Sequence, residues 1–250
     1  MAASLDAMLD RLHESFRAQE RFISAVSHEL KTPLSVMLGQ AQVLARLTRE
    51  PGEYERFVAA VQDEARSLSR TVESLLLLAK AEAGLPLLSR SPISINEAVM
   101  DAVSRCAPLA DQREVRLATN LAMPSDERGE PIVEGDGEML SLMVSNLIRN
   151  AIRYAPPDSA VGVQVAAAGD RVEISVRDHG TGIPNEYLDR VFDRFFQVPK
   201  DTEAFRGVGL GLTITRGVAE LHGGSVSVSN HPEGGCEFRV QLPLRAARTV

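Results

Sequence analysis

The stretch that decides the fold of the larger part of the chain is Asn146-Leu147-Ile148-Arg149-Asn150-Ala151-Ile152-Arg153-Tyr154. It closes a helix predicted from Asp136 to about Tyr154. At about 100° per residue, two amides, a guanidinium and a phenol fall within one quadrant of this helix: Asn146, Asn150, Arg153 and Tyr154. A separate apolar arc, suited to a core, contains Leu140, Val144, Leu147 and Ala151. The polar face is either a solvated surface or a ligand site, because amide oxygens suit Mg²⁺ and a guanidinium suits phosphate.

Strand-like and helix-like segments alternate around this helix. A short strand is expected at Ile93–Ile95, followed by a helix from the cap Asn96 to about Ala110. The other expected strands are Val115–Leu121, Ile132–Glu134, Val161–Ala167, Val172–Arg177, Ser225–Ser229 and Cys236–Leu242, and a last helix covers Gly209–Leu221. Strands mixed with three main helices predict an α/β sandwich with its helices on one face of the sheet.

Two glycine clusters could contact a nucleotide. Asp178-His179-Gly180-Thr181-Gly182 follows a predicted strand; its carboxylate could accept the amine of adenine, and its glycines allow a close backbone approach. Gly207-Val208-Gly209-Leu210-Gly211-Leu212 leads into a helix, so its N–H groups and the helix dipole could hold phosphate. The alternatives are a common surface turn for the first cluster and a flexible linker for the second.

An aromatic segment lies between the two glycine clusters. Val191-Phe192-Asp193-Arg194-Phe195-Phe196 has helical apolar spacing, and Gln197–Arg206 has no clear periodicity. An anchored aromatic patch followed by a mobile stretch would suit a nucleotide lid. The simpler interpretation is a helix packed on the core, followed by a loop.

The first third of the chain has the pattern of a helical hairpin. Apolar residues recur alternately four and three apart over residues 5–37 and again over 54–79, and Pro-Gly marks a turn at Thr48–Glu53. One hairpin cannot bury its apolar seam well, whereas two hairpins form a four-helix bundle. The pattern therefore predicts a homodimer.

One histidine of this hairpin points away from the apolar seam. His28 lies in Ser27-His28-Glu29-Leu30-Lys31-Thr32-Pro33, between two seam positions. A neutral imidazole is a nucleophile near pH 7, and Glu29 could accept a proton. A solvated surface histidine is the plain alternative, and it is the interpretation kept for His13.

Composition excludes several classes of protein. The 250 residues carry a net charge of −7, no Trp and 4% aromatics, which argues against nucleic acid as the main partner. Cys106 and Cys236 lie far apart and are expected to be reduced thiols. No apolar run approaches the roughly 18 residues of a membrane span, so the chain as given is expected to be soluble and cytoplasmic.

In order along the chain, five stretches resemble the H, N, G1, F and G2 boxes of bacterial sensor histidine kinases. They are Ser-His-Glu-Leu-Lys-Thr-Pro, Asn-Leu-Ile-Arg-Asn-Ala, Asp-His-Gly-Thr-Gly, Phe-Asp-Arg-Phe-Phe and Gly-Val-Gly-Leu-Gly-Leu. The resemblance spans essentially the whole chain and implies an α+β fold. It implies the tail of a signalling linker helix at residues 1–20 and a dimerisation and phosphotransfer domain at 21–88. An ATP-binding α/β sandwich of the gyrase and histidine-kinase type would cover 89–246, and the parent protein would be anchored in the bacterial inner membrane.

The resemblance also implies a role for each matching residue. His28 would be the phosphoacceptor and Glu29 its general base, while Thr32 would place a water for dephosphorylating the partner. On the predicted helix, Asn150 would ligate Mg²⁺ with Asn146 nearby, Arg153, where relatives often carry Lys, would contact phosphate, and Tyr154 would pack on adenine. Asp178 would bind the adenine amine, and the rest of the nucleotide pocket and lid would be formed by Gly180, Gly182, Phe195, Gly207, Gly209, Gly211 and Leu212.

The function expected on these grounds is ATP- and Mg²⁺-dependent autophosphorylation of His28. The phosphoryl group would then pass to an aspartate of a response-regulator receiver domain, toward which the chain would also act as a phosphatase. Three alternatives are a gyrase-type ATPase or chaperone that forms no phosphohistidine, a non-catalytic signalling scaffold, and a family member in which the phosphatase dominates.

Overall fold

The computed structural model describes residues 90–122, 130–199 and 209–245 continuously, and single residues or short runs between 27 and 72. The chain divides into two units, Met1–Leu76 and Leu77–Val250. In the first unit the described residues are helical, including 33–39 and 56–62. Gly52, inside the predicted turn Thr48–Glu53, is helical as well, and the rest of that turn lies outside the described residues.

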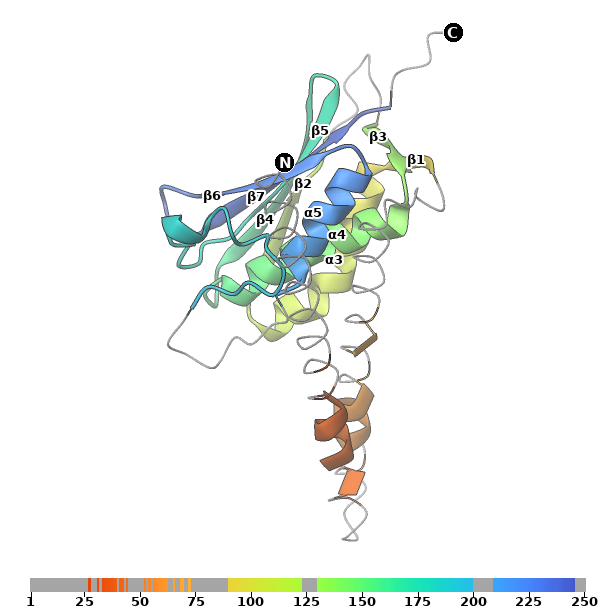
Figure 1. Cartoon of the computed structure of the whole chain (residues 1–250), viewed down its shortest axis with the longest axis vertical. Coiled ribbons are helices and arrows are strands. Elements are labelled where there is room, and N and C mark those ends of the chain that lie inside the picture. The colour runs from red at the N-terminus through yellow and green to blue at the C-terminus, as the bar shows by residue number, and fades with distance from the viewer. Residues whose placement is uncertain are drawn as a thin grey trace, which may run out of the picture. The chain divides into compact units, whose positions relative to one another are not determined.

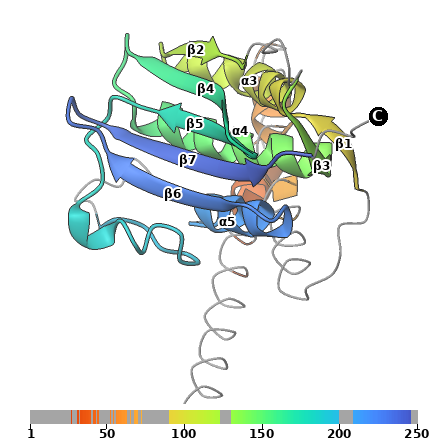
Figure 2. The same ribbon diagram turned by 90° about the horizontal axis from the view of Figure 1, so that it is seen from above.

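A five-stranded mixed sheet, in the order β2-β4-β5-β7-β6, forms one layer of the second unit (Figures 1 and 2). The strands are β2 (Arg116–Asn120), β4 (Ala160–Ala168), β5 (Arg171–Arg177), β6 (Ser225–Asn230) and β7 (Cys236–Pro243). β2 and β4 run parallel, and the other neighbours are antiparallel. A separate antiparallel pair joins β1 (Ser91–Ser94) to β3 (Ile132–Gly135).

Three helices cover one face of this sheet: α3 (Ile95–Gln112), α4 (Gly137–Tyr154) and α5 (Gly211–Leu221) (Figure 2). The predicted apolar arc of α4 is confirmed, since Leu140, Val144, Leu147 and Ala151 are all fully buried. Alternate residues of β5 and β7 complete the core, which confirms the predicted α/β sandwich. Among the described helices, none combines the length and apolar character that crossing a bilayer requires.

The predicted start of α3 was wrong by two residues. Ser94 is the N-cap, and its Oγ accepts the N–H of Glu97 at 3.2 Å in a Ser-x-x-Glu capping arrangement. Asn96 lies inside the helix and donates from Nδ2 to the carbonyl of Ala122 at 2.9 Å. Ile95, expected in a strand, is therefore the first helical residue.

The helix considered for Val191–Phe196 does not form. A short 3-10 helix η1 (Asn185–Tyr187) is followed by turns. Val191 and Phe192 are nevertheless buried, and the guanidinium of Arg216 on α5 lies 4.7 Å from the centre of the Phe192 ring. The aromatic segment is thus anchored to the core without helical structure, while residues 200–208 lie outside the described part of the chain.

A buried histidine links the end of α5 to the start of α4. Nδ1–H of His222 donates to the Val218 carbonyl at 2.8 Å, and Nε2 accepts the Asp136 N–H at 3.1 Å. Burial lowers the pKa of His222, which favours the neutral ring that these two bonds require. Asp136 in turn caps α4 by accepting the N–H groups of Glu138 and Met139.

Candidate functional site

The polar face of α4 forms the floor of the candidate site. Asn146, Asn150, Arg153 and Tyr154 are each half-buried, above the fully buried apolar arc. From Asn146 to Tyr154 the helix rises about 12 Å, so one face can serve both a base and phosphates. Nδ2 of Asn146 is buried and lacks a hydrogen-bond partner among the described residues. Leaving such a donor unpaired costs roughly 1–3 kcal/mol, so an acceptor supplied by a ligand would fit here.

The N-terminus of α5 lies beside Asn146. A Cβ added to Gly211 would come 3.9 Å from the Cβ and Cγ atoms of Asn146. The preceding residue, Leu210, gives the helix no side-chain cap, so the first-turn N–H groups of Gly211 and Leu212 have no helical acceptor. This arrangement would suit an anion, so phosphate binding at this helix end stays a prediction.

Gly209 and Phe195 meet at the entrance to α5. The N–H of Phe195 donates to the Gly209 carbonyl at 3.0 Å, and both residues have positive φ, 59° and 71°. A Cβ at Gly209 would lie 2.7 Å from the Phe195 backbone, closer than real Cβ contacts allow. The predicted F and G2 residues therefore meet through their backbones, and Gly207 lies outside the described residues.

Asp178 follows β5 directly and is only 1% exposed. Its Oδ1 accepts the N–H of Gly180 at 2.8 Å and that of Cys236 at 3.4 Å, and its Oδ2 lies 3.0 Å from the Cys236 Sγ. Burial, and then the Asp178 carboxylate, raises the pKa of the Cys236 thiol far above its ordinary value, so the thiol keeps its proton and donates. The carboxylate is held in one orientation from two sides.

The Asp178 loop packs against the C-terminal end of α4. A Cβ at Gly180 would lie 2.4 Å from the carbonyl oxygen of Tyr154, so glycine is required at this contact. Gly182 has a φ of +70°, a conformation that glycine adopts readily. Thus one glycine cluster lies at the Tyr154 end of the polar face, and the other lies at the Asn146 end.

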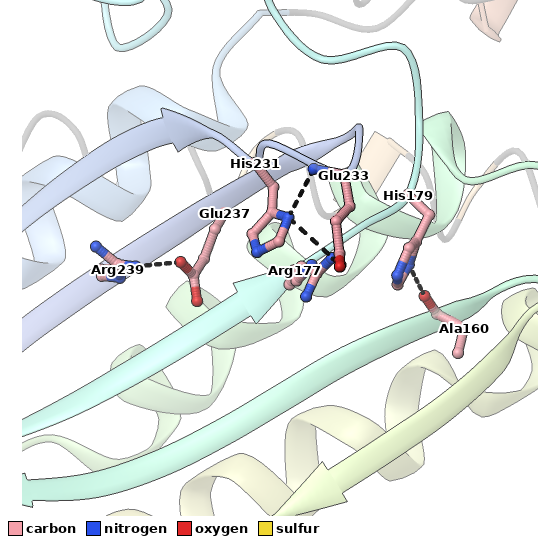
Figure 3. Close-up of polar contacts among 7 residues, drawn as sticks. All are labelled: Ala160, Arg177, His179, His231, Glu233, Glu237 and Arg239. Atoms are coloured by element: carbon pink, nitrogen blue, oxygen red, sulfur yellow. Dashed lines mark hydrogen bonds and ion pairs between the residues drawn. The ribbon is translucent and has the colours of Figure 1, made fainter.

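Charged side chains join the end of β5, just before the Asp178 loop, to the turn between β6 and β7 (Figure 3). The guanidinium of Arg177 lies 2.8 Å from Oε2 of Glu233, and the Nδ1 atom of His231 lies 3.9 Å from the same oxygen. The hydrogen bond from Arg177 lowers the pKa of Glu233. His179 shares a hydrogen bond of 2.9 Å with the carbonyl of Ala160, the first residue of β4.

The structure brings most of the predicted nucleotide residues together but does not describe the phosphoacceptor. Asn150 and Arg153 lie on the same face of α4 as Asn146 and Tyr154. Of the predicted site residues, four lie outside the described part of the chain: His28, Glu29, Thr32 and Gly207.

The strands Ser225–Ser229 and Cys236–Leu242 were predicted from the sequence, but the contact between their turn and the Asp178 loop was not. Cys236 and Gly235 lie more than fifty residues downstream, and a Cβ at Gly235 would lie 2.1 Å from the Asp178 carbonyl oxygen. The pair Gly234-Gly235 before a strand was the available signal, since both residues have positive φ.

Two domain families match the chain. The family described as the His Kinase A (phospho-acceptor) domain matches residues 18–84. The family described as histidine kinase-, DNA gyrase B-, and HSP90-like ATPase matches residues 135–246.

Individual relatives match nearly the whole chain. The sensor protein IrlS of Burkholderia pseudomallei is 33% identical over 99% of this chain and 52% of its own length. The sensor-like histidine kinase SenX3 of Mycobacterium tuberculosis is 35% identical over 90% of this chain and 54% of its own. The chain thus spans about half the length of these relatives. Among solved structures, full-length ShkA in complex with AMPPNP is 26% identical, with a TM-score of 0.65 over 90% of this chain and 46% of that one.

Proposed function

The chain belongs to the sensor histidine kinases of two-component systems, and from this premise we propose that it uses ATP to phosphorylate His28. One observation carries the proposal: Gly180 packs against the backbone of Tyr154 and Gly211 lies beside Asn146, so both glycine clusters flank one face of α4. A base and a triphosphate can therefore be bound along a single helix. The relative ShkA, whose structure contains AMPPNP, supports the choice of nucleotide.

Each end of the α4 face has a separate task in this proposal. At the Tyr154 end, the oriented Asp178 carboxylate accepts the adenine amine while the Tyr154 ring packs on the base. At the other end, Asn146 Nδ2 and the first N–H groups of α5 donate to phosphate oxygens. Arg153 adds a positive charge on the same face.

Mg²⁺ fits the residues present at the phosphate end. Asn150 offers an amide oxygen beside the predicted phosphate position, and Mg²⁺ commonly combines one or two protein oxygens with phosphates and water. When bound, the ion would neutralise charge on the phosphates. The residues of this chain supply orientation: the α4 amides and the N-terminus of α5 hold the terminal phosphate for in-line attack.

The transfer step exchanges one bond for another. A ring nitrogen of His28 forms a bond to the γ-phosphorus, the bond from that phosphorus to the β,γ-bridging oxygen breaks, and ADP leaves with the electron pair. Glu29 takes the imidazole proton. The phosphoryl group then passes to an aspartate carboxylate of a response-regulator receiver domain. In a separate phosphatase reaction, Thr32 orients a water molecule that hydrolyses this phosphoaspartate.

The helical unit is proposed to act as a homodimer, with residues 21–88 as the dimerisation and phosphotransfer domain and 89–246 as the ATP-binding domain. Large apolar side chains of its described part are exposed in a single chain: Leu34, Val36, Leu38, Tyr54, Val58 and Val72. Leu34 and Leu38 share one face of their helix, as do Tyr54, Val58 and Val72, and a second copy in a four-helix bundle would cover these faces. Sedimentation at micromolar concentration is expected to give twice the mass of one chain, whereas a monomer would contradict this part of the proposal.

Radiolabelling tests the phosphorylation directly. The chain is incubated with γ-labelled ATP and Mg²⁺, and the label is expected to be stable in alkali, lost in acid and absent from His28→Ala. His13→Ala is the matched control and should label like the wild type. Turnover of ATP without a covalent label would favour the gyrase-type alternative, and label that persists in His28→Ala would refute the proposed acceptor.

A further inference from the structure

Asn230 makes an unusual set of hydrogen bonds for an exposed residue. It is the last residue of β6, and its Oδ1 accepts the N–H of Ile183 at 2.8 Å. Its Nδ2 donates to the carbonyl of the same Ile183 at 2.6 Å and to Oδ1 of Asn185 at 3.2 Å. A side-chain amide that pairs with both backbone groups of one residue reproduces the two bonds of an antiparallel strand pair.

The position of Asn230 relates this bonding to the nucleotide loop. In the register of β6 and β7, Asn230 lies opposite Cys236. Cys236 holds Asp178 at the start of the loop, and Asn230 holds Ile183 at its end. The hairpin therefore holds both ends of the six-residue loop from Asp178 to Ile183.

The loop is also close to Asn230 in space. A Cβ on Gly182 would lie 2.9 Å from the Asn230 Oδ1. The loop backbone thus approaches the amide closely only because residue 182 is glycine. This tight fit indicates that the amide determines where Gly182 and Ile183 lie.

We infer that Asn230 is a positioning residue that sets the conformation of the Asp178–Ile183 loop for binding the adenine base. The inference rests on the proposed function and adds a determinant outside the five motifs. Asn230 acts through the loop: with Ile183 fixed, Gly180 stays in register with both the Asp178 carboxylate and the end of α4. Asp178 keeps its own bonds to Cys236, so loss of Asn230 loosens the far end of the loop without releasing the carboxylate.

A second contact of the same hairpin turn provides the contrast. The ion pair of Arg177 with Glu233 also joins the turn to the β5 side of the loop, but the Glu233 side chain is 76% exposed. Solvent-exposed ion pairs contribute little, so this contact is not expected to determine the loop conformation. Glu233→Gln is therefore the control in the same turn, because it removes the ion pair while keeping the size of the side chain.

The experiment uses the whole chain and measures two properties. Amide hydrogen exchange of Ile183 is followed without nucleotide, and dissociation constants for ATP and ITP are measured by calorimetry. In Asn230→Ala, exchange at Ile183 should accelerate and the dissociation constant for ATP should rise about five- to tenfold, the effect of losing one to two ordinary hydrogen bonds. ITP carries an oxygen in place of the adenine amine, so its affinity should change less and the preference for ATP should fall.

The controls separate positioning from general stability. Glu233→Gln should bind ATP like the wild type, and Asn185→Ala, which leaves both bonds to Ile183 intact, should do so too. At saturating ATP, Asn230→Ala should label His28 at the wild-type rate, because the defect lies in binding. Unchanged exchange at Ile183, or an equal loss of affinity for ATP and ITP, would overturn the inference. Failure of the wild type itself to bind ATP would instead refute the proposed function, while exchange at Ile183 would still report whether Asn230 holds the loop.

Discussion

The contact between Gly180 and Tyr154 allows a quantitative prediction for Gly180→Ala. The new Cβ would lie 2.4 Å from the Tyr154 carbonyl oxygen, and real Cβ contacts essentially never fall below 3.0 Å. The loop and the end of α4 must therefore separate by at least 0.6 Å (3.0 − 2.4). The obstacle is backbone and cannot rotate away, so the usual overpacking cost of about 1–3 kcal/mol applies. For a unit of this size that corresponds to a fall in Tm of roughly 2–12 °C.

The same separation should weaken nucleotide binding. Asp178 lies on one side of the contact and the Tyr154 ring on the other, so widening it misaligns the two groups proposed to hold adenine. Loss of one hydrogen bond to a charged acceptor, about 1.5–3 kcal/mol, would raise the dissociation constant for ATP roughly 10- to 150-fold.

Thermal unfolding and calorimetric titration with ATP measure both effects. The matched control is Gly162→Ala in β4, where a new Cβ would meet no described atom within 4 Å. That variant should bind ATP normally and be as stable as the wild type or slightly more so, because alanine restricts the unfolded chain. If Gly180→Ala matches Gly162→Ala in both Tm and affinity, the reasoning about the loop contact is wrong.

Three further predictions concern buried polar groups. Asp178→Asn should bind ATP roughly 10- to 150-fold more weakly in calorimetry, because the amide loses the charged acceptor, while its Tm stays within a few degrees; wild-type affinity would contradict the assigned role. Burial raises the folded pKa of the Cys236 thiol above the ordinary 9.0, so the stability that this thiol contributes is complete below pH 9 and is lost as pH rises; between pH 8 and 10 the unfolding free energy in urea should fall by roughly 1 kcal/mol more in the wild type than in Cys236→Ala. Burial lowers the folded pKa of His222, so the stability that this residue contributes is present above pH 6.5 and is lost as pH falls. In a plot of unfolding free energy against pH, His222→Gln should reduce the loss of stability at acidic pH; an unchanged loss would show that other groups cause it.

Local patterns in the sequence predicted most of the second unit. The apolar arc of α4, the start of this helix at Asp136 and the strands β4 and β5 depend on neighbouring residues, and all are present in the structure. Local reasoning failed where two neighbouring residues could serve the same role. Ser94 and Asn96 are both good helix caps. Glu97 lies three residues after Ser94, the spacing of a capping box, and this favours Ser94 as the cap. Apolar spacing alone suggested a helix for Val191–Phe196, but the buried side chains of Val191 and Phe192 anchor that segment in turns.

The candidate site was only partly predictable for a different reason. The motif residues carry recognisable side chains in a recognisable order, so Asn146, Asp178 and Gly211 could be named in advance. The groups that orient them come from distant sequence. Cys236 and Asn230 act on Asp178 and Ile183 through strand pairing, and a cysteine or an asparagine near a turn has no pattern that reveals such a contact.

The position of β7 has a consequence for how the protein matures in the cell. Of the described strands β7 is synthesised last, yet it lies between β5 and β6 in the sheet. A nascent chain that has left the ribosome up to β6 already contains Asp178, but it lacks the Cys236 groups that orient the carboxylate. Cellular ATP should therefore bind only chains in which β7 has inserted into the sheet. By mass action, this binding would shift the equilibrium from partly assembled chains toward the chains with β7 in place.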